Sequence, residues 1–472
     1  MKILSRSPSL LLCACALSST FTATLLTSMP ASAEPLVRMQ TVVGDFFIDL
    51  TPEVAPATVA NFLTYVNSGA YDEMFMHRSV PGFVIQGGGF AWPLGATGPV
   101  NVPANPPVIN EFNTSNVRGT VAMAKLGGDP NSATNEWFVN LADNGPNLDN
   151  QNGGFTVFGT INAQGMAVVD IMAILPVINA GGVFSDLPVL EVLPSTTRSE
   201  LVIVNSAQQF TTITAPAAAV LPASRSVGVS ASAATGFATI VNSAGAEAAS
   251  CTISLASDIP ANFSYRQTNP ANNQAFGPND PSLDIPALGS VSVIFSLFPT
   301  APIPTTAVEF NFTCGNASAG AALTPGVNTF ELSASTTPGA DVVALAATSA
   351  ESPGINDIPT AIGSGAFAVA TVNVGEQETI TVSADTGSAS LPVGLFVCET
   401  NPDTSDCLSA PALTTSATFA NNETATFAVF AQLINANDSV PFNPATNRAF
   451  VRFRNATGDL RGSTSVALRT LP

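Results

Sequence analysis

Histidine, lysine and charge in general are scarce in this sequence. Its 472 residues include one histidine, His77, and only 10% are charged. A single histidine excludes zinc sites built from several histidines and any relay of histidine side chains. The 14 basic residues are outnumbered by 33 acidic ones, giving a formal net charge of −19. Nucleic acid and anionic membrane surfaces are therefore poor partners. Hydrophobic residues make up 46%, so the chain is not disordered, and its length suits about two to four domains.

Long apolar runs are absent beyond the N-terminal segment, so we expect no membrane span despite a mean hydropathy of +0.33. That segment has the pattern of a signal peptide over 1–33: basic Lys2 and Arg6, an apolar stretch from Ser9 to Leu26, and a cleavage site at Ala31-Ser32-Ala33. Its removal leaves a formal charge of −21, because it carries two basic and no acidic residues. Cys15 offers an alternative lipidated N-terminus, but the apolar run before it is short. We expect a protein exported to the periplasm or the cell exterior.

Four cysteines remain after such cleavage: Cys251, Cys314, Cys398 and Cys407. An even number in an exported chain favours disulfides over free thiols or a metal site. Cys251 and Cys314 could staple one module, while Cys398 and Cys407 would close a short loop. The sequence leaves three connectivities open.

The mature sequence divides into two compositional zones. Residues 34–205 mix strand patterns with one or two helical patterns, whereas 206–472 are dominated by Ala, Thr, Ser, Val and Pro with strand-like alternation. Within the second zone, FSYRQTNP (263–270) resembles LFVCETNP (395–402), and each is followed by Phe-rich strands. The sequence predicts two β-sandwich modules, 206–340 and 341–472. No catalytic constellation is evident in either module.

The most informative segment runs from Tyr71 to Phe90. Arg78 is the only Lys or Arg between Arg38 and Arg118, and it lies in an apolar, strand-like run. A simple interpretation is an edge arginine paired with a carboxylate such as Asp72 or Glu111. Gln86 is followed by three glycines that allow close approach of a ligand. No lysine follows the glycines and Rossmann spacing is absent, so a phosphate cradle is not expected.

The first zone contains a series of ordered blocks. They are VRMQTVVGDFFIDLTPEVAPATVANFLTYVNSGAYD (37–72), HRSVPGFVIQGGGF (77–90), INEF (109–112), RGTVAMA (118–124), NSATNEWFVNLADN (131–144), LDN (148–150) and FTVFG (155–159). In this order the blocks resemble the cyclophilin-type peptidyl-prolyl cis-trans isomerases. The resemblance implies a closed eight-stranded antiparallel barrel capped by two helices. The first helix would lie in 55–68, where Val59, Phe62 and Leu63 share one face.

The resemblance also implies the site residues. Arg78 matches the catalytic arginine and Gln86 the glutamine that helps to hold the substrate backbone. His77 belongs to the same motif but, as a strand neighbour of Arg78, should face the other way and serve packing or hydrogen bonding. The implied substrate-binding residues are Phe83, Val84, Ala124, Lys125, Glu136, Phe138, Leu148 and Phe155.

Three departures from the family pattern bear on activity. Glu136 replaces a glutamine, Lys125 replaces an asparagine-like residue, and Asn147 stands where vertebrate members have the tryptophan associated with cyclosporin binding. If Glu136 pairs with Lys125, Arg78 stays free for catalysis; if it pairs with Arg78, the site becomes a binder at best.

The resemblance predicts an exported isomerase that rotates X-Pro bonds and assists folding outside the cytoplasm. It implies no cofactor and no metal, proline-containing peptides or unfolded exported proteins as partners, and a monomer. The alternative is a catalytically weak, proline-peptide-binding or adhesion protein of the cell surface.

Overall fold

The computed structural model describes residues 35–435 and 437–471. The expected signal peptide and Cys15 lie outside the described residues. As the sequence predicted, the described chain consists mainly of β-strands. None of the helices in these ranges combines the length and the apolar character needed to cross a membrane.

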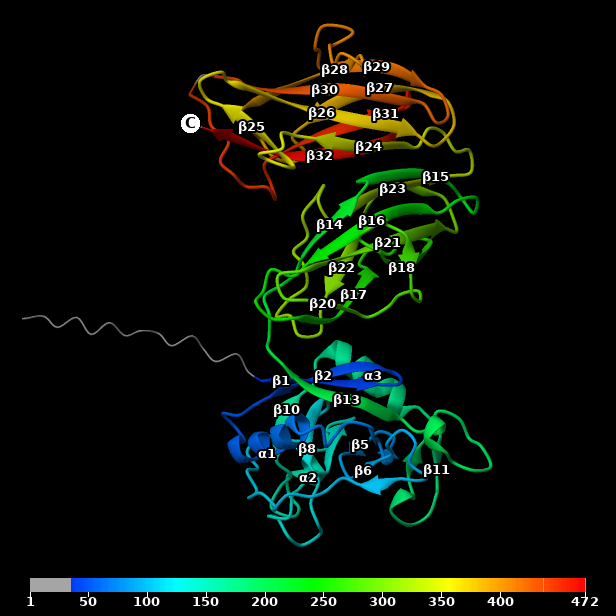
Figure 1. Ribbon diagram of the computed structural model, residues 1–472, viewed down its shortest axis with the longest axis vertical. Coiled ribbons are helices and arrows are strands. Elements are labelled where there is room, and N and C mark those ends of the chain that lie inside the picture. Colours follow the sequence, from blue (N-terminus) through cyan, green and yellow to red (C-terminus); the bar gives the residue numbers. More distant parts are fainter. Residues whose placement is uncertain (1–34, 436, 472) are drawn as a thin grey trace, which may run out of the picture. The chain divides into compact units, whose positions relative to one another are not determined.

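The N-terminal part is built on one large sheet (Figure 1). Its strand order is β4-β5-β9-β8-β10-β2-β1-β13-β3-β6-β7. Three of these eleven strands, β3, β6 and β7, have two residues each, which leaves the eight longer strands that the resemblance implies. The elements are β1 (Leu36–Thr41), β2 (Gly44–Leu50), α1 (Pro56–Asn67), β3 (Met74–Phe75), β4 (Arg78–Val80), β5 (Val84–Gly87), β6 (Phe90–Ala91), β7 (Val100–Asn101), β8 (Thr120–Met123), β9 (Trp137–Asn140), α2 (Gly145–Leu148), β10 (Val157–Thr160), α3 (Ala163–Ala173), β11 (Val177–Ile178), η1 (Gly182–Phe184), β12 (Leu187–Pro188), η2 (Arg198–Glu200) and β13 (Ile203–Phe210).

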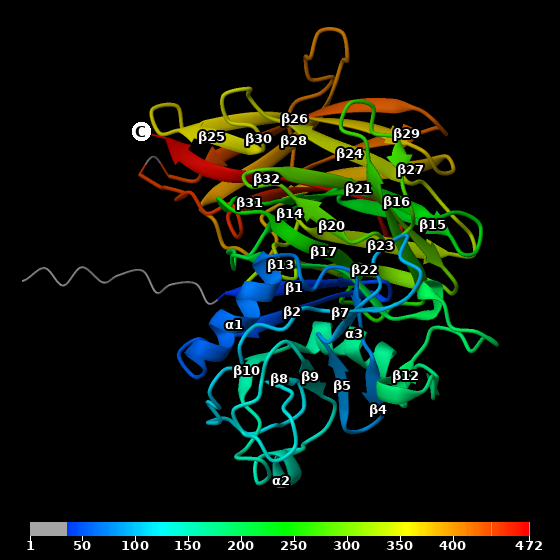
Figure 2. The ribbon, with the colours of Figure 1, turned by 60° about the horizontal axis from the view of Figure 1, so that its bottom comes forward.

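Helix α1 forms where the sequence placed the first helix, and it packs against β13, while α3 packs against β2 (Figures 1 and 2). Val59 and Phe62 are buried and Leu63 is half-buried, in agreement with the predicted face. The helix has no side-chain cap of its own. Instead, Glu111 accepts hydrogen bonds from the backbone N–H groups of Ala57 and Thr58, where a negative charge is favourable.

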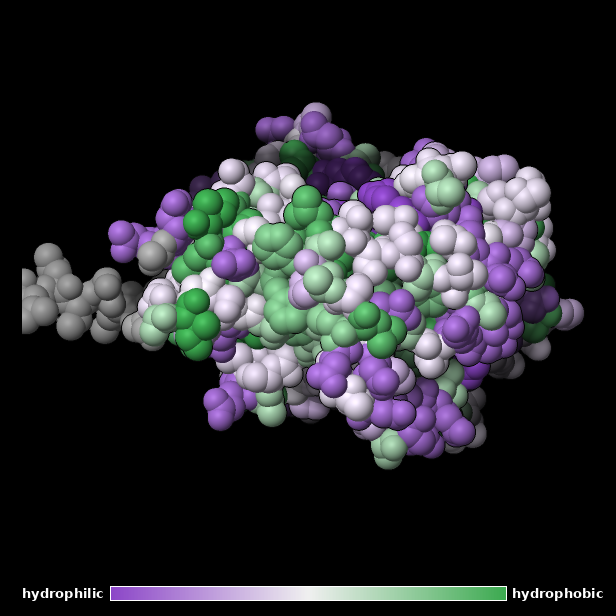
Figure 3. Space-filling model, turned by 90° about the horizontal axis from the view of Figure 1, so that it is seen from above, coloured by the Kyte–Doolittle hydropathy of each residue, from purple (hydrophilic) through white to green (hydrophobic). Residues whose placement is uncertain are grey.

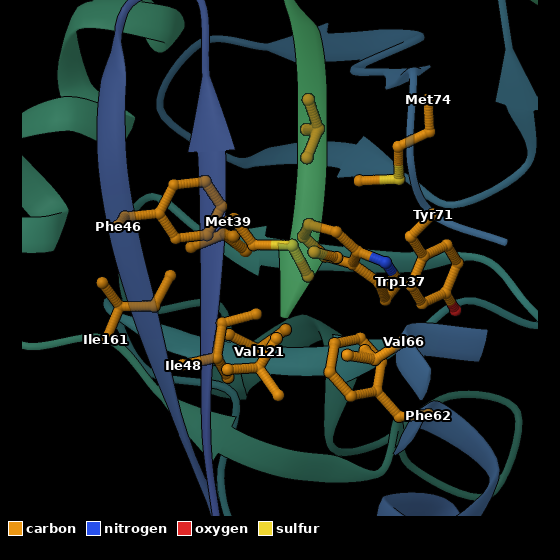
Figure 4. Packing of buried hydrophobic residues seen from close by; sticks show 14 of the residues in the cluster. Met39, Phe46, Ile48, Phe62, Val66, Tyr71, Met74, Val121, Trp137 and Ile161 are labelled. Atoms are coloured by element: carbon orange, nitrogen blue, oxygen red, sulfur yellow. The ribbon is translucent and has the colours of Figure 1, made fainter. Parts of the chain in front are cut away.

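The core of this part is aromatic at its centre (Figure 4). Phe62 from α1 lies within 4.9–6.2 Å, centroid to centroid, of the rings of Tyr71, Trp137 and Phe158. All four side chains are fully buried. This packing fixes β9 beneath α1, and the next residue of β9, Phe138, points to the opposite face.

Two further groups of strand pairings follow. The first consists of β14 (Ala217–Leu221), β15 (Ser224–Gly228), β16 (Ala234–Val241), β17 (Ala248–Leu255), β18 (Ala261–Thr268), β19 (Ala275–Phe276), β20 (Leu283–Ile285), β21 (Ser290–Pro299), β22 (Ile303–Thr313) and β23 (Thr329–Ser335). The second consists of β24 (Val342–Ala347), β25 (Ile355–Pro359), β26 (Ser364–Asn373), β27 (Glu378–Asp385), β28 (Val393–Thr400), β29 (Thr414–Phe419), β30 (Thr424–Leu433), β31 (Arg448–Arg454) and β32 (Leu460–Leu471). The predicted domain limits, 205/206 and 340/341, stay predictions.

Both groups have the same topology. The sheets are β14-β16-β21-β18-β19 and β15-β23-β22-β17-β20 in the first, and β24-β26-β30-β28 and β25-β32-β31-β27-β29 in the second. When β19 is left out of the numbering, the two orders are identical, including the parallel pairs β15–β23 and β25–β32. The segments that resemble each other in sequence lie in the equivalent strands β18 and β28.

Alternation along the strands accounts for the high hydropathy. Along β26, Phe367 and Val369 are buried, whereas Ala366, Ala368 and Ala370 are exposed. Small apolar side chains therefore occupy outward positions that are often polar. Figure 3 shows hydrophobic residues gathered near the middle of one face of the molecule.

The four cysteines are paired as Cys251–Cys314 and Cys398–Cys407. This is one of the three connectivities that the sequence left open. Cys251 lies in β17 and Cys398 in β28, so each bond joins a strand of one module to a later segment of that same module.

Candidate active site

Nine of the ten residues expected at the site line one cavity of about 260 Å³. The cavity opens between β4, β5, β9 and the segment that contains α2. The tenth residue, Glu136, is not part of the lining but is bonded to it. The lining residues are Arg78, Phe83, Val84, Gln86, Ala124, Lys125, Phe138, Leu148, Gln151 and Phe155.

Arg78 and Gln86 lie directly opposite each other on the antiparallel strands β4 and β5. A guanidinium N–H of Arg78 donates to Oε1 of Gln86 at 3.3 Å. The Arg78 side chain is 35% exposed, so its donors remain accessible from the cavity. Cross-strand pairing thus places the Arg78 cation and the planar amide of Gln86 side by side in the lining of the cavity.

Arg78 does pair with a carboxylate, but the partners considered from the sequence were wrong. Its Nε lies 3.7 Å from Oδ2 of Asp186. Asp72 instead accepts a hydrogen bond from the main chain of β13, and Glu111 caps α1. Asp186 is 44% exposed, so this ion pair is well solvated and weak.

Glu136 pairs with neither Lys125 nor Arg78, so both pairings considered from the sequence were wrong. Its Oε2 accepts a hydrogen bond from Nε2 of Gln86 at 2.6 Å and lies 3.5 Å from Nε2 of His77. Burial alone raises the pKa of Glu136, but the contacts with His77 and Gln86 lower it more, and the pKa lies below its ordinary value. A carboxylate thus fixes Gln86 with its oxygen turned towards Arg78.

Gly89, the third glycine after Gln86, makes room for that carboxylate. A Cβ at Gly89 would lie 2.5 Å from Oε1 of Glu136, so any larger residue would displace the Glu136 side chain. His77, which directly precedes β4, is buried, and its ring packs edge-on against Phe90 with 5.0 Å between the ring centroids. Together with the contact to Glu136, this agrees with the packing or hydrogen-bonding role expected for His77.

Lys125 is held away from Glu136. Its ammonium donates to the carbonyls of Asn152 and Gly154 and to Oδ1 of Asn110. It also lies 4.8 Å from the ring centroid of Phe155. Burial lowers the pKa of Lys125 from its ordinary value. Lys125 therefore braces the aromatic wall of the cavity.

The floor and walls are apolar. Val84, Phe138 and Leu148 are buried, and Phe83 and Phe155 are half-buried around them. The Phe138 and Phe155 rings meet edge to face at 5.9 Å. A small aliphatic ring fits such a pocket, and Arg78 and Gln86 add polar groups to its lining.

Sequence reasoning missed two residues, Asp186 and Gln151. Gln151 lies three residues beyond Leu148, so the expected position of Leu148 at the site already pointed to this part of the chain. Asp186 belongs to a segment in which no motif was recognised. No group of three or more His, Cys, Asp or Glu side chains within the described residues could hold a metal ion.

Comparison with known proteins assigns the N-terminal part. The family model described as "Cyclophilin type peptidyl-prolyl cis-trans isomerase/CLD" matches residues 36–192. A peptidyl-prolyl cis-trans isomerase of Acinetobacter baylyi is 39% identical over 155 residues, which are 32% of this chain and 79% of that protein. This chain belongs to the cyclophilin-type peptidyl-prolyl cis-trans isomerases. Its cyclophilin part is also 39% identical over 143 residues to peptidyl-prolyl cis-trans isomerase B of Escherichia coli, covering 29% of this chain and 82% of that protein.

Among solved structures, the cyclophilin part is similar to a Cryptosporidium parvum cyclophilin crystallised in the presence of the dipeptide Ala-Pro. The match has 21% identity and a TM-score of 0.28 and covers 37% of this chain and 97% of the other.

Proposed function

We propose that this cyclophilin is exported and accelerates X-Pro rotation in proteins that fold outside the cytoplasm, with Arg78 as the catalytic donor. The observation that carries the proposal is the position of Arg78 and Gln86 at the rim of an apolar cavity. One side of the site suits a pyrrolidine ring, and the other suits the peptide group that precedes it.

The chemistry requires neither a nucleophile nor a cofactor. Rotation about an X-Pro bond crosses a barrier of about 18–20 kcal/mol because amide resonance is lost when the bond twists. The proline nitrogen then regains its lone pair, which a guanidinium N–H can stabilise. A preorganised donor of this kind contributes about 10²–10³-fold to a rate. Arg78 would bind the twisted amide more strongly than either planar isomer.

Gln86 has two roles in this scheme. Its amide is held between Arg78 and Glu136, so it orients the guanidinium. The amide nitrogen retains a second N–H and the oxygen a second lone pair, so Gln86 can both donate a hydrogen bond to the substrate backbone and accept one from it. The apolar wall of Phe83, Phe138 and Leu148 would fix the proline ring while the peptide group rotates.

Export is supported by two independent features. The N-terminal pattern is that of a signal peptide, and the described cysteines form two disulfides, which persist in oxidising compartments. Clients in such a compartment would be exported chains that still contain non-native prolyl isomers.

A refolding experiment tests the folding role. A disulfide-intact client whose slow refolding phase is limited by prolyl isomerisation is diluted from denaturant with the mature protein or with its Arg78→Ala variant. We expect the slow phase to accelerate in proportion to the wild-type concentration and to be nearly unchanged with the variant. Peptide binding without acceleration by either protein would contradict the proposal and favour the adhesion alternative.

A further inference from the structure

A second cavity lies in the cyclophilin part, apart from the prolyl site. Its volume is about 540 Å³, roughly twice that of the prolyl cavity. Short strands and turns from two stretches of the chain, 75–99 and 178–201, form its walls. It has the size and largely apolar lining of a binding site.

The walls of this second cavity are aromatic and firmly placed. Phe75, Leu187 and Leu201 are buried beneath it. Phe184 packs against Phe75 at 5.8 Å between ring centroids. The Trp92 indole nitrogen donates to a main-chain carbonyl, which leaves the face of the ring to form a wall.

An ion pair beside this wall keeps it in place. Arg198 lies 3.0 Å from a carboxylate oxygen of Glu73, and its Nε donates to the main-chain oxygen of Trp92. The rim is formed in part by Leu193, whose side chain is 43% exposed, and by the exposed Ala180. The cavity therefore has a preformed apolar interior and an open mouth.

One short segment joins the second cavity to the prolyl site. Phe184 and Leu187 line the second cavity, while Asp186, between them, faces the guanidinium of Arg78 at 3.7 Å. The main-chain oxygen of Asp186 accepts a hydrogen bond from Ser79 of β4 at 2.8 Å. Phe184 and Asp186 are two residues apart, and two residues of extended chain span at most about 7 Å. The second cavity therefore begins close to the carboxylate that faces Arg78, and a bound peptide would reach from one site to the other with a few residues.

We propose that this cavity takes an aromatic or large aliphatic side chain of the same polypeptide whose prolyl bond lies beside Arg78. The proposal rests on the isomerase function proposed above and specifies its substrate class: unfolded segments with an apolar residue a few positions from proline. Such segments are exposed in unfolded chains and buried in folded ones, because apolar side chains form the core. The second cavity would thus favour clients that still need to fold.

The test compares peptides that differ at one position. Decapeptides with one proline carry either Phe or Ser at a distance of about two to six residues from it. Affinity is measured by calorimetry, and turnover by NMR exchange, with the full mature protein. We expect at least one Phe position to lower Kd and KM by about tenfold relative to Ser, as burial of an aromatic side chain would.

Two variants locate the effect. Leu193→Ser removes an apolar group from the rim, and Ala180→Trp fills the mouth. Both should abolish the advantage of the Phe peptide and leave turnover of a short X-Pro tetrapeptide unchanged, which also shows that they are folded. Ile174→Ser is the matched control, because Ile174 is 82% exposed and lines neither cavity.

The outcomes separate this proposal from the proposed function. Equal affinity for Phe and Ser peptides, or a Phe advantage that survives both variants, would overturn it. So would equally tight binding of Phe peptides in which alanine replaces proline, since the cavity would then serve apolar ligands in general. Tight, Leu193-dependent binding without turnover would uphold the second site and refute the isomerase function.

Discussion

The polar residues of the prolyl site form a chain of contacts from His77 through Glu136 and Gln86 to Arg78. The negative charge of Glu136 is thus directed at Gln86 and not at the guanidinium of Arg78. Its position is fixed by the close approach to Gly89. At the residue scale, the Glu136 carboxylate is compatible with the proposed catalysis because two hydrogen bonds, with Gln86 between them, separate it from Arg78.

Replacement of Glu136 by Gln should therefore have little effect. A glutamine oxygen can accept the same hydrogen bond from Gln86, and Arg78 loses no direct partner. We expect kcat/KM on a tetrapeptide to change by less than about threefold, which is below 1 kcal/mol. A tenfold gain, measured by NMR exchange, would mean that the charge opposes the reaction.

The pH dependence of kcat/KM should likewise be insensitive to the replacement of Glu136 by Gln. A carboxyl group whose folded-state pKa is lowered contributes stability above its unfolded pKa, and this contribution is lost as pH falls through the folded pKa. Because the contacts with His77 and Gln86 hold the pKa of Glu136 below its ordinary value, its carboxylate should stay ionised throughout the neutral and mildly acidic range. The pH profiles of kcat/KM for wild type and Glu136→Gln should therefore coincide from pH 8 to about pH 5. Divergence between pH 5 and 7 would contradict this account.

Residue identities at the site were easier to predict than residue partners. The motif blocks placed Arg78 and Gln86 in one region, and strand pairing puts them side by side. The partners of Glu136 and Lys125 depend on side-chain direction across neighbouring strands, which sequence spacing does not fix. Asp186 reaches Arg78 from more than a hundred residues away, in a segment without a recognisable pattern.

Among the elements, α1 is the one whose sequence and packing agree most fully. Its apolar face follows helical spacing, so its position could be predicted. The order of the short strands β3, β6 and β7 could not, because two-residue strands carry no periodicity. In the later modules, the repeated segments indicated a duplication, but only the strand pairings give the order within each sheet.

Removal of the Phe62 ring should destabilise the cyclophilin part. Phe62 is fully buried among Tyr71, Trp137 and Phe158, so Phe62→Ala leaves a cavity that costs about 3–5 kcal/mol of unfolding free energy. Both tryptophans of the chain, Trp92 and Trp137, lie in this part, so their fluorescence in urea reports its unfolding separately.

Leu63→Ala is the matched control for this prediction. Leu63 is on the same helix but only half-buried, so we expect a smaller loss. Equal losses for the two variants would mean that the aromatic cluster does not anchor α1.

For the whole molecule, net charge is the dominant property. With 33 acidic and 14 basic residues, the protein should attract cationic clients over distances that salt screens. We expect kcat/KM for a peptide with lysines flanking the X-Pro bond to fall by a few-fold to about tenfold between about 20 and 500 mM NaCl. The matched glutamate peptide should show a rise, and an uncharged peptide little change. Identical salt dependence for all three would exclude a role for the overall charge in client capture.

The central claim is that Arg78 stabilises the twisted prolyl bond, and NMR exchange on a short X-Pro peptide tests it most directly. The mature protein is compared with Arg78→Ala and with the control Arg118→Ala, which removes an arginine that pairs with Asp170. We expect kcat/KM to fall by about 100-fold or more in Arg78→Ala, the usual loss when one preorganised donor is removed, and to stay near wild type in the control. Undiminished exchange in Arg78→Ala would contradict the account.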